Sequence, residues 1–435
     1  ILPLLLGLLF QQFYAMVDTV VVGNFLGMEA LAGVGSTGSI NFLVLGLCNG
    51  VCAGFAIPVA QKFGEKDFDG LRNFVGNMIW LGGIIALIVT AVTTIGCRAI
   101  LTAMNTPEST FSYAYDYIFL IFLGIPATML YNLLSGILRS LGDSRTPLMF
   151  LVFSSLLNVA LDIVCVVTLQ MGVAGAGWAT LISQLISGLL CLLYMDRKFP
   201  ILHLKRENLV WRGHCVRRLL IMGLPMGLQY SITAIGSILL QTAVNGLGAV
   251  SMAAVAASGK VTGLFASPYD AMGTMAATYA GQNLGAGKLD RVHHGVKDCC
   301  ILGVAYSLAA LVVMYFLGAQ MTALFLDSKD VASSAQILPL ARQLLVTNAA
   351  FYIPLLGVNL FRFTIQGLGY SNLAVIAGVS EMIARGAVAA LVSVFGFTAV
   401  CYASPAAWVL ADCFLLPAYF VCMKRRTKEA AAARE

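Results

Sequence analysis

Hydrophobic stretches, each of about twenty residues or more, recur along the whole chain and alternate with short polar segments. A helix of about 20 apolar residues is long enough to cross the hydrocarbon core of a membrane, which is roughly 30 Å thick. The pattern predicts twelve transmembrane helices, near residues 1–23, 32–57, 73–96, 114–137, 147–169, 173–194, 218–244, 250–280, 295–317, 334–361, 373–395 and 400–423. The predicted fold class is therefore an all-α membrane protein.

The composition favours the same class. Apolar residues make up 59% of the chain and charged residues only 11%, whereas a soluble domain has roughly 25% charged residues. The chain opens at Ile1, within a hydrophobic run and without Met, so we expect its natural beginning to lie further upstream.

The sequence also contains an internal repeat. Several polar and glycine positions recur 221 residues later, and the matched pairs are Gln61 and Gln282, Gly64 and Gly285, Asp69 and Asp290, and Gly27 and Gly248. Further along the chain the offset becomes 227, which pairs Gly142 with Gly369. Because the offset spans six predicted helices, an even number, both copies enter the membrane in the same direction and form a parallel repeat.

The positive charges predict the orientation of the helices. Of the Lys and Arg residues in the loops, 21 fall in alternate loops, Arg362 among them, against two in the remaining loops, Arg98 and Lys329. Positive residues accumulate on the cytoplasmic side, so we expect a multi-pass protein of the plasma (inner) membrane with both termini in the cytoplasm. This topology accounts for the net charge of +6, which gives no reason to invoke nucleic acid.

These observations predict the domain organisation. We expect an N-terminal six-helix lobe at 1–194, a cytoplasmic linker at 195–217, a C-terminal six-helix lobe at 218–423 and a cytoplasmic tail at 424–435. The linker is basic and carries Trp211, so it is either a solvated connector, which we favour, or a lipid-binding segment on the membrane surface.

Metal and disulfide chemistry have no support in the sequence. The eleven cysteines are scattered, without a C-x-x-C pair, and the four histidines lack a second ligand at metal-site spacing. We expect no cofactor and no structural metal. An enzyme such as a membrane-embedded transferase would need a convergent acidic or histidine cluster, which does not occur.

Two carboxylates within the first-lobe spans are the strongest candidates for function. Asp18 and Asp162 lie in spans without a cationic residue, and a charge inside a membrane is expensive unless it is neutralised. At 1.5 Å per residue both come within roughly 10 Å of the outer face, as does Thr180. Asn158 lies on the helical face of Asp162, and Gln11 and Tyr14 lie on that of Asp18. Interhelical polar packing without transport is the alternative.

Other polar residues within spans have a less certain role. Glu381 and Arg385 have the spacing of an ion pair on one helix, for which a structural role is favoured over a second coupling site. Asp270 is either a counter-ion for a substrate or a partner for a cation in its own lobe, and Tyr131 is a further accessory candidate.

Five motifs carry a resemblance to a known family. They are V-D-T-V-V-V-G around Asp18, L-R-S-L-G-D-S-R-T-P at 138–147, N-V-A-L-D at 158–162, G-A-G-W-A-T at 175–180 and G-Q-N-L-G-A-G-K at 281–288. In this order, over a duplicated chain of twelve predicted spans, they resemble the multidrug and toxic compound extrusion (MATE) family. The resemblance covers nearly the whole chain.

The resemblance implies a fold and an activity. It implies two six-helix bundles that form a V-shaped central cleft, and antiport of small amphipathic, often cationic, organic compounds against H⁺ or Na⁺ by alternating access. The positions that match the family's first-lobe coupling site are Asp18, Asn158, Asp162 and Thr180. Some members instead use acids in the seventh and tenth spans; this chain has none at 218–244 or 334–361, which favours the bacterial DinF-like type.

The coupling ion and the substrate remain open. Two carboxylates in a poorly hydrated pocket do not readily ionise together, which favours H⁺ as the coupling ion, although the same oxygens suit Na⁺. A flippase for lipid-linked oligosaccharides or cell-wall precursors is the alternative function; it would need several cations in its cavity, where Lys260 and Arg342 are the candidates. We expect a monomer that has membrane lipids and organic substrates as its partners.

Overall fold

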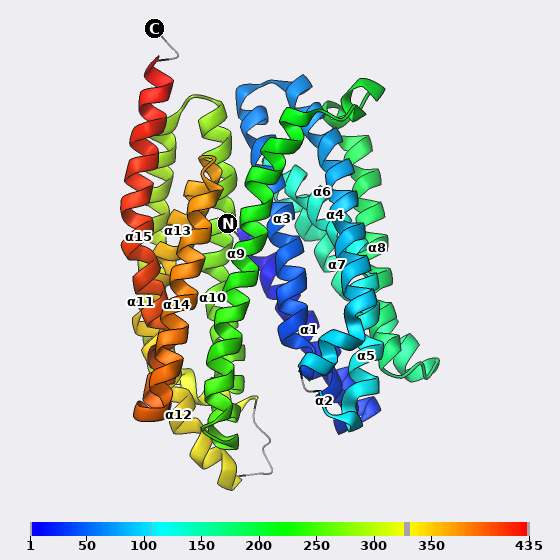
Figure 1. The fold of residues 1–435 in the computed structure, drawn as a ribbon, viewed down its shortest axis with the longest axis vertical. Coiled ribbons are helices and arrows are strands. Elements are labelled where there is room, and N and C mark those ends of the chain that lie inside the picture. The colour runs from blue at the N-terminus through cyan, green and yellow to red at the C-terminus, as the bar shows by residue number, and fades with distance from the viewer. Residues whose placement is uncertain (1, 105, 326–330, 433–435) are drawn as a thin grey trace. The chain divides into compact units, whose positions relative to one another are not determined.

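The computed structural model describes residues 2–104, 106–325 and 331–432, except for the side chains of residues 12–20, 24, 28 and 331–334. Helices account for nearly all of these residues (Figure 1). The contacts divide the chain into two compact units, a first unit from Leu2 to Leu228 and a second unit from Gln229 to the end of the chain. Each unit is described by itself.

The first unit contains eight long helices and the linker. The helices are α1 (Leu2–Leu26), α2 (Met28–Ser36), α3 (Gly38–Glu65), α4 (Phe68–Ala103), α5 (Glu108–Leu123), α6 (Ile125–Ser140), α7 (Arg145–Asp162) and α8 (Val173–Lys198). A π-helix, η1 (Ile163–Thr168), continues α7 without a break, and the linker contains the short 3₁₀-helices η2 (Pro200–Leu202) and η3 (Arg206–Leu209).

The second unit begins within α9 (Gly213–Asn245), which both units share. Its other helices are α10 (Ala249–Gly285), α11 (Leu289–Ala323), α12 (Val331–Ala350), α13 (Tyr352–Gly367), α14 (Ser371–Phe395) and α15 (Phe397–Ala432). The buried aromatic rings of Tyr269, Tyr352 and Trp408 join α10, α13 and α15 at the centre of this unit.

The prediction of an all-α membrane fold is confirmed. Among the described residues, nine helices are long and apolar enough to cross a membrane, and two bent pairs, α5–α6 and α12–α13, raise this number to eleven. Helix α1 covers the first predicted span, so each of the twelve predicted spans falls on one helix or on two consecutive helices of the described chain. The V-shaped cleft between the lobes stays a prediction.

The backbone preserves the repeat that the sequence predicts. Residues with positive φ occur at equivalent positions of the two copies, with φ of 88° and 92° at Gly27 and Gly248, 89° and 94° at Gly142 and Gly369, and 64° and 59° at Gly172 and Gly396. Only glycine adopts this left-handed region without a steric penalty. The bends recur as well, by 44° in α5–α6 and by 52° in α12–α13, near Pro126 and Pro354. Helices α9 and α10, in contrast, continue through Pro225 and Pro268.

The linker packs on α4 through its backbone. The side-chain amide of Asn77, which is fully buried, donates to the carbonyl of Val210 at 3.2 Å and accepts the backbone N–H of Arg212 at 2.8 Å. The indole N–H of Trp80 donates to the carbonyl of Leu209 at 2.9 Å. The side chains of Val210 and Trp211 stay exposed, so the solvated connector and the lipid-binding segment both stay predictions.

Helix α9 crosses α3 at four glycines. Gly50 and Gly54 of α3 face Gly223 and Gly227 of α9, and a Cβ added at Gly50 or Gly54 would lie 2.6 Å from a carbonyl oxygen of α9. Both pairs have the G-x-x-x-G spacing that lets membrane helices approach closely. Beyond this crossing, Gln229 accepts a hydrogen bond of 2.7 Å from Gln366 of α13. The boundary between the two compact units thus lies inside α9, and the predicted lobe and linker bounds stay a prediction.

Candidate functional site

Three of the predicted coupling residues lie at the end of α7 and on α8. The side-chain amide of Asn158 donates to the hydroxyl of Thr180 at 3.3 Å, which joins the two helices. Asp162 lies one turn after Asn158 on the same face of α7 and is 0% exposed. The π-helix η1 begins at the next residue, and such turns are rare and often lie at functional sites.

One acceptor atom in this cluster is unused. The carbonyl oxygen of the Asn158 side chain is buried, and no described residue donates a hydrogen bond to it. Buried polar atoms are nearly always satisfied, and the side chains at 12–20 of α1, which packs against α7, lie outside the described residues.

The remaining first-lobe candidates differ in their placement. The side chains of Asp18 and Tyr14 lie outside the described residues, although the backbone of their helix α1 packs against α7. Gln11 is exposed on α1. The hydroxyl of Tyr131, which is buried, donates to the carbonyl of Pro147 at 2.8 Å and so ties α6 to the start of α7.

The second unit contains a buried ion cluster that the sequence indicated only in part. Glu381 accepts from Arg385 at 3.2 Å, as its spacing predicted, and also from Arg362 of α13. The sequence placed Arg362 in a cytoplasmic loop, but α13 extends to Gly367 and Arg362 is only 6% exposed. The repeat could have indicated this position. Arg362 precedes Gly369 by seven residues, and its counterpart Ser135, which precedes Gly142 by seven residues, lies within α6.

Two further carboxylates lie near this cluster. Asp412 of α15 lies over Gly357 of α13. A Cβ added at Gly357 would come within 2.8 Å of the Oδ1 atom of Asp412. Asp270 is exposed on α10. The positive charge of Arg362 acts on both carboxylates, so Asp270 has a cation of its own unit within electrostatic range.

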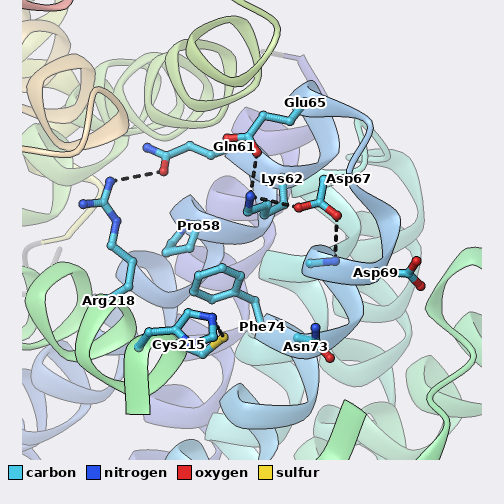
Figure 2. Close-up of a pocket in the computed structure, with 12 residues that line it drawn as sticks. Pro58, Gln61, Lys62, Glu65, Asp67, Asp69, Asn73, Phe74, Cys215 and Arg218 are labelled. Carbon is cyan, nitrogen blue, oxygen red and sulfur yellow. Dashed lines mark hydrogen bonds and ion pairs between the residues drawn. The ribbon is translucent and has the colours of Figure 1, made fainter. Parts of the chain in front are cut away.

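A hollow of about 670 Å³ lies at one end of the first unit, between α3, α4 and the start of α9 (Figure 2). Lys62 forms ion pairs with Glu65 at 2.6 Å and with Asp67 at 2.9 Å. The guanidinium group of Arg218 donates a hydrogen bond to the side-chain oxygen of Gln61 at 3.3 Å. The hydrogen bond from Lys62, together with that from the backbone N–H of Gly70, holds the pKa of Asp67 below its usual range. Lys62 is thus neutralised within the hollow by two carboxylates, whereas Arg218 bonds to the uncharged amide of Gln61.

Metal chemistry finds no support in the described part of the chain. The described residues contain no group of three or more His, Cys, Asp or Glu side chains that could hold a metal ion. All eleven cysteines are free, and nine of them are buried. They act as small apolar packing residues.

Comparisons with known proteins agree with the fold and the repeat. A sequence model of the MatE family matches residues 3–164 and 225–398, one segment in each copy of the repeat. The probable multidrug resistance protein YpnP of Bacillus subtilis is 27% identical over 84% of this chain and 80% of its own length.

Solved structures show the same architecture. A crystal structure of a MATE protein in its bent conformation superposes with a TM-score of 0.88 at 20% identity, and covers 99% of this chain and 95% of that one. A MOP-superfamily transporter from Pyrococcus furiosus, whose published title reports a binding pocket of reverse polarity, superposes with a TM-score of 0.87 at 21% identity, over 100% of this chain and 95% of that one.

The duplicated helical fold and its buried polar groups define a polytopic membrane transporter, not an enzyme. Because the family match covers well over half of the sequence, in both copies of the repeat, the chain belongs to the MatE family of transporters.

Proposed function

We propose that this protein exports small amphipathic, often cationic, organic compounds across the plasma membrane in exchange for protons. The name of the Bacillus subtilis relative supports multidrug export. The observation that carries the coupling mechanism is the fully buried Asp162, one turn from the Asn158–Thr180 hydrogen bond.

The cluster is suited to the reversible binding of a coupling ion. A buried carboxylate is costly unless a proton or a cation neutralises it. Asn158 uses its N–H₂ group on Thr180, and its own oxygen has no donor among the described residues. A protonated carboxyl supplies the O–H donor that this oxygen lacks, which favours H⁺. Na⁺ is the alternative, since the same oxygens are suitable ligands for a hard cation.

The direction of transport depends on the orientation of the chain, for which we retain both termini in the cytoplasm and a parallel repeat. Asp69 and Asp290 are exposed, repeat-related positions that suit a labelling test. Single cysteines there, in a background without accessible native thiols, should react only with a reagent applied from the cytoplasmic side. Labelling from opposite sides would contradict the parallel repeat.

Export of organic compounds is favoured over the flipping of a pyrophosphate-linked lipid. Such a flippase needs open cations in its cavity, but Arg362 and Arg385 are buried and neutralised by Glu381. Lys260 and Arg342 are exposed, and Arg342 is directed toward the carbonyl and ring of Tyr315. The buried cluster therefore adds no accessible positive charge for a polyanionic substrate.

The proposal is tested with purified protein in proteoliposomes loaded with the organic cation ethidium. An imposed inward H⁺ gradient without Na⁺ should drive its efflux, and an inward Na⁺ gradient without a pH difference should not. Strict dependence on Na⁺ would contradict proton coupling. Absence of ethidium transport under either gradient, with transport of a lipid-linked precursor instead, would contradict drug export.

A further inference from the structure

Asp412 lies in the second unit, apart from the polar cluster assigned to coupling. Its helix α15 packs against α13, where the missing side chain of Gly357 leaves room for the carboxylate. The Oδ1 atom is buried, and no described residue forms a hydrogen bond with it. Trp408 and Ala411, which are buried and apolar, precede it on α15. Asp412 as a whole is half-buried, and the buried part of its carboxylate lacks the hydrogen bonds that would stabilise the ionised form.

The charges around Asp412 act on its ionised form in both directions. Arg362 attracts the ionised carboxylate, whereas Glu381 repels it. Arg362 and Arg385 are permanently charged, and both contact Glu381. With Asp412 ionised, these four groups therefore hold two positive and two negative charges; with Asp412 protonated, one positive charge is in excess.

Other charged groups in this unit have partners elsewhere or lie further away. From α10, Asp270 competes for the positive charge of Arg362. From α12, Arg342 is directed toward Tyr315 of α11. From α11, His293 contacts Tyr419 at 3.4 Å, and Tyr419 is seven residues, or about 10 Å, further along α15. The state of Asp412 thus depends mainly on its apolar surroundings and on the Arg362–Glu381–Arg385 cluster.

We propose that Asp412 is a second proton-binding site, separate from Asp162, at which the carboxylate takes a proton from water to become the neutral acid and later returns it. No other bond forms or breaks. Because the opposing charges belong to α13 and α14, each proton changes the electrostatic balance among α13, α14 and α15. This places a titratable switch beside the bent pair α12–α13, in the unit that carries no predicted coupling residue.

Infrared difference spectroscopy of the purified full-length protein in detergent tests this proposal without substrate or gradient. Between mildly alkaline and mildly acidic buffer, the wild type should gain a C=O stretching band of protonated Asp412, distinct from the band that Asp162 contributes. The Asp412→Asn variant should lose this band. Asp412→Glu should retain it at a shifted frequency, which keeps the test informative if the asparagine variant folds poorly. Asp270→Asn and Asp162→Asn are the controls and should both keep it.

An unchanged band in Asp412→Asn, or a band that disappears only in Asp162→Asn or Asp270→Asn, would overturn the second site. Since the measurement involves no transport, that result would leave the proposed export function standing. Conversely, a failure of gradient-driven efflux would not remove an Asp412 band.

Discussion

Replacing Glu381 with glutamine tests the buried ion cluster most directly. The side chain of Glu381 is 3% exposed and those of Arg362 and Arg385 are 7% and 8% exposed, so none of the three charges is substantially hydrated. Glutamine keeps the size of the side chain but removes its negative charge. Two buried guanidinium groups then lose their counter-ion, and breaking a buried pair in this way costs about 3–5 kcal/mol.

The matched control is an ion pair at the surface. Asp69 pairs with Arg72 at 2.5 Å, but its side chain is 86% exposed. Exposed pairs contribute only about 0–1 kcal/mol, so Asp69→Asn should leave stability nearly unchanged.

The assay is thermal unfolding in detergent, followed with a thiol-reactive fluorophore, because nine of the eleven cysteines are buried and react only on unfolding. Glu381→Gln should lower the unfolding midpoint far more than Asp69→Asn does. Combining Glu381→Leu with Arg362→Met and Arg385→Met should recover most of the loss, because an apolar core of similar volume replaces the whole cluster. A Glu381→Gln variant as stable as the wild type would refute the argument.

Three further predictions concern the first unit. Gly54→Leu should weaken the crossing of α3 and α9 by about 1–3 kcal/mol because the added side chain overpacks it, whereas Gly83→Ala, where nothing lies within 4 Å of a new Cβ, should be neutral or stabilising in the same unfolding assay. Asn77→Ala leaves the backbone N–H of Arg212 without its acceptor, so trypsin should cut the linker faster than in the wild type; equal cleavage rates would contradict the packing of the linker on α4. The lowered pKa of Asp67 predicts that its stabilising bonds are complete above the ordinary pKa of Asp, about 4, and are lost only as the pH falls through the lower folded value. Hydrogen exchange at the Gly70 amide, corrected for its intrinsic pH dependence, should therefore show constant protection from neutral to mildly acidic pH.

Much of the fold was predictable because the membrane imposes simple rules. Apolar runs located all twelve spans, and the matched glycines located the repeat, since positive φ at Gly27 and Gly248 or at Gly142 and Gly369 requires that residue type. The hydrogen bond between Asn158 and Thr180 joins two residues that the sequence had grouped in one site, and their role in coupling stays a prediction.

Other features depended on tertiary contacts that a sequence pattern does not record. Arg362 seemed to belong to a loop because a charge normally ends a membrane span, yet Glu381 on the next helix neutralises it. The basic composition of the linker also gave no indication that its backbone hydrogen-bonds to Asn77 and Trp80 of α4. The position of the unit boundary within α9 follows from the glycine crossing with α3, which becomes visible only when both helices are placed.

The central claim is that Asp162 couples the proton gradient to export, and the decisive measurement is ethidium transport by the Asp162→Asn variant in proteoliposomes. The variant keeps the size of a side chain that is fully buried but cannot exchange a proton. It should fold, should still carry ethidium down its own concentration gradient, and should show no acceleration by an inward H⁺ gradient. Efflux by Asp162→Asn that responds to the H⁺ gradient as strongly as the wild type would contradict the account.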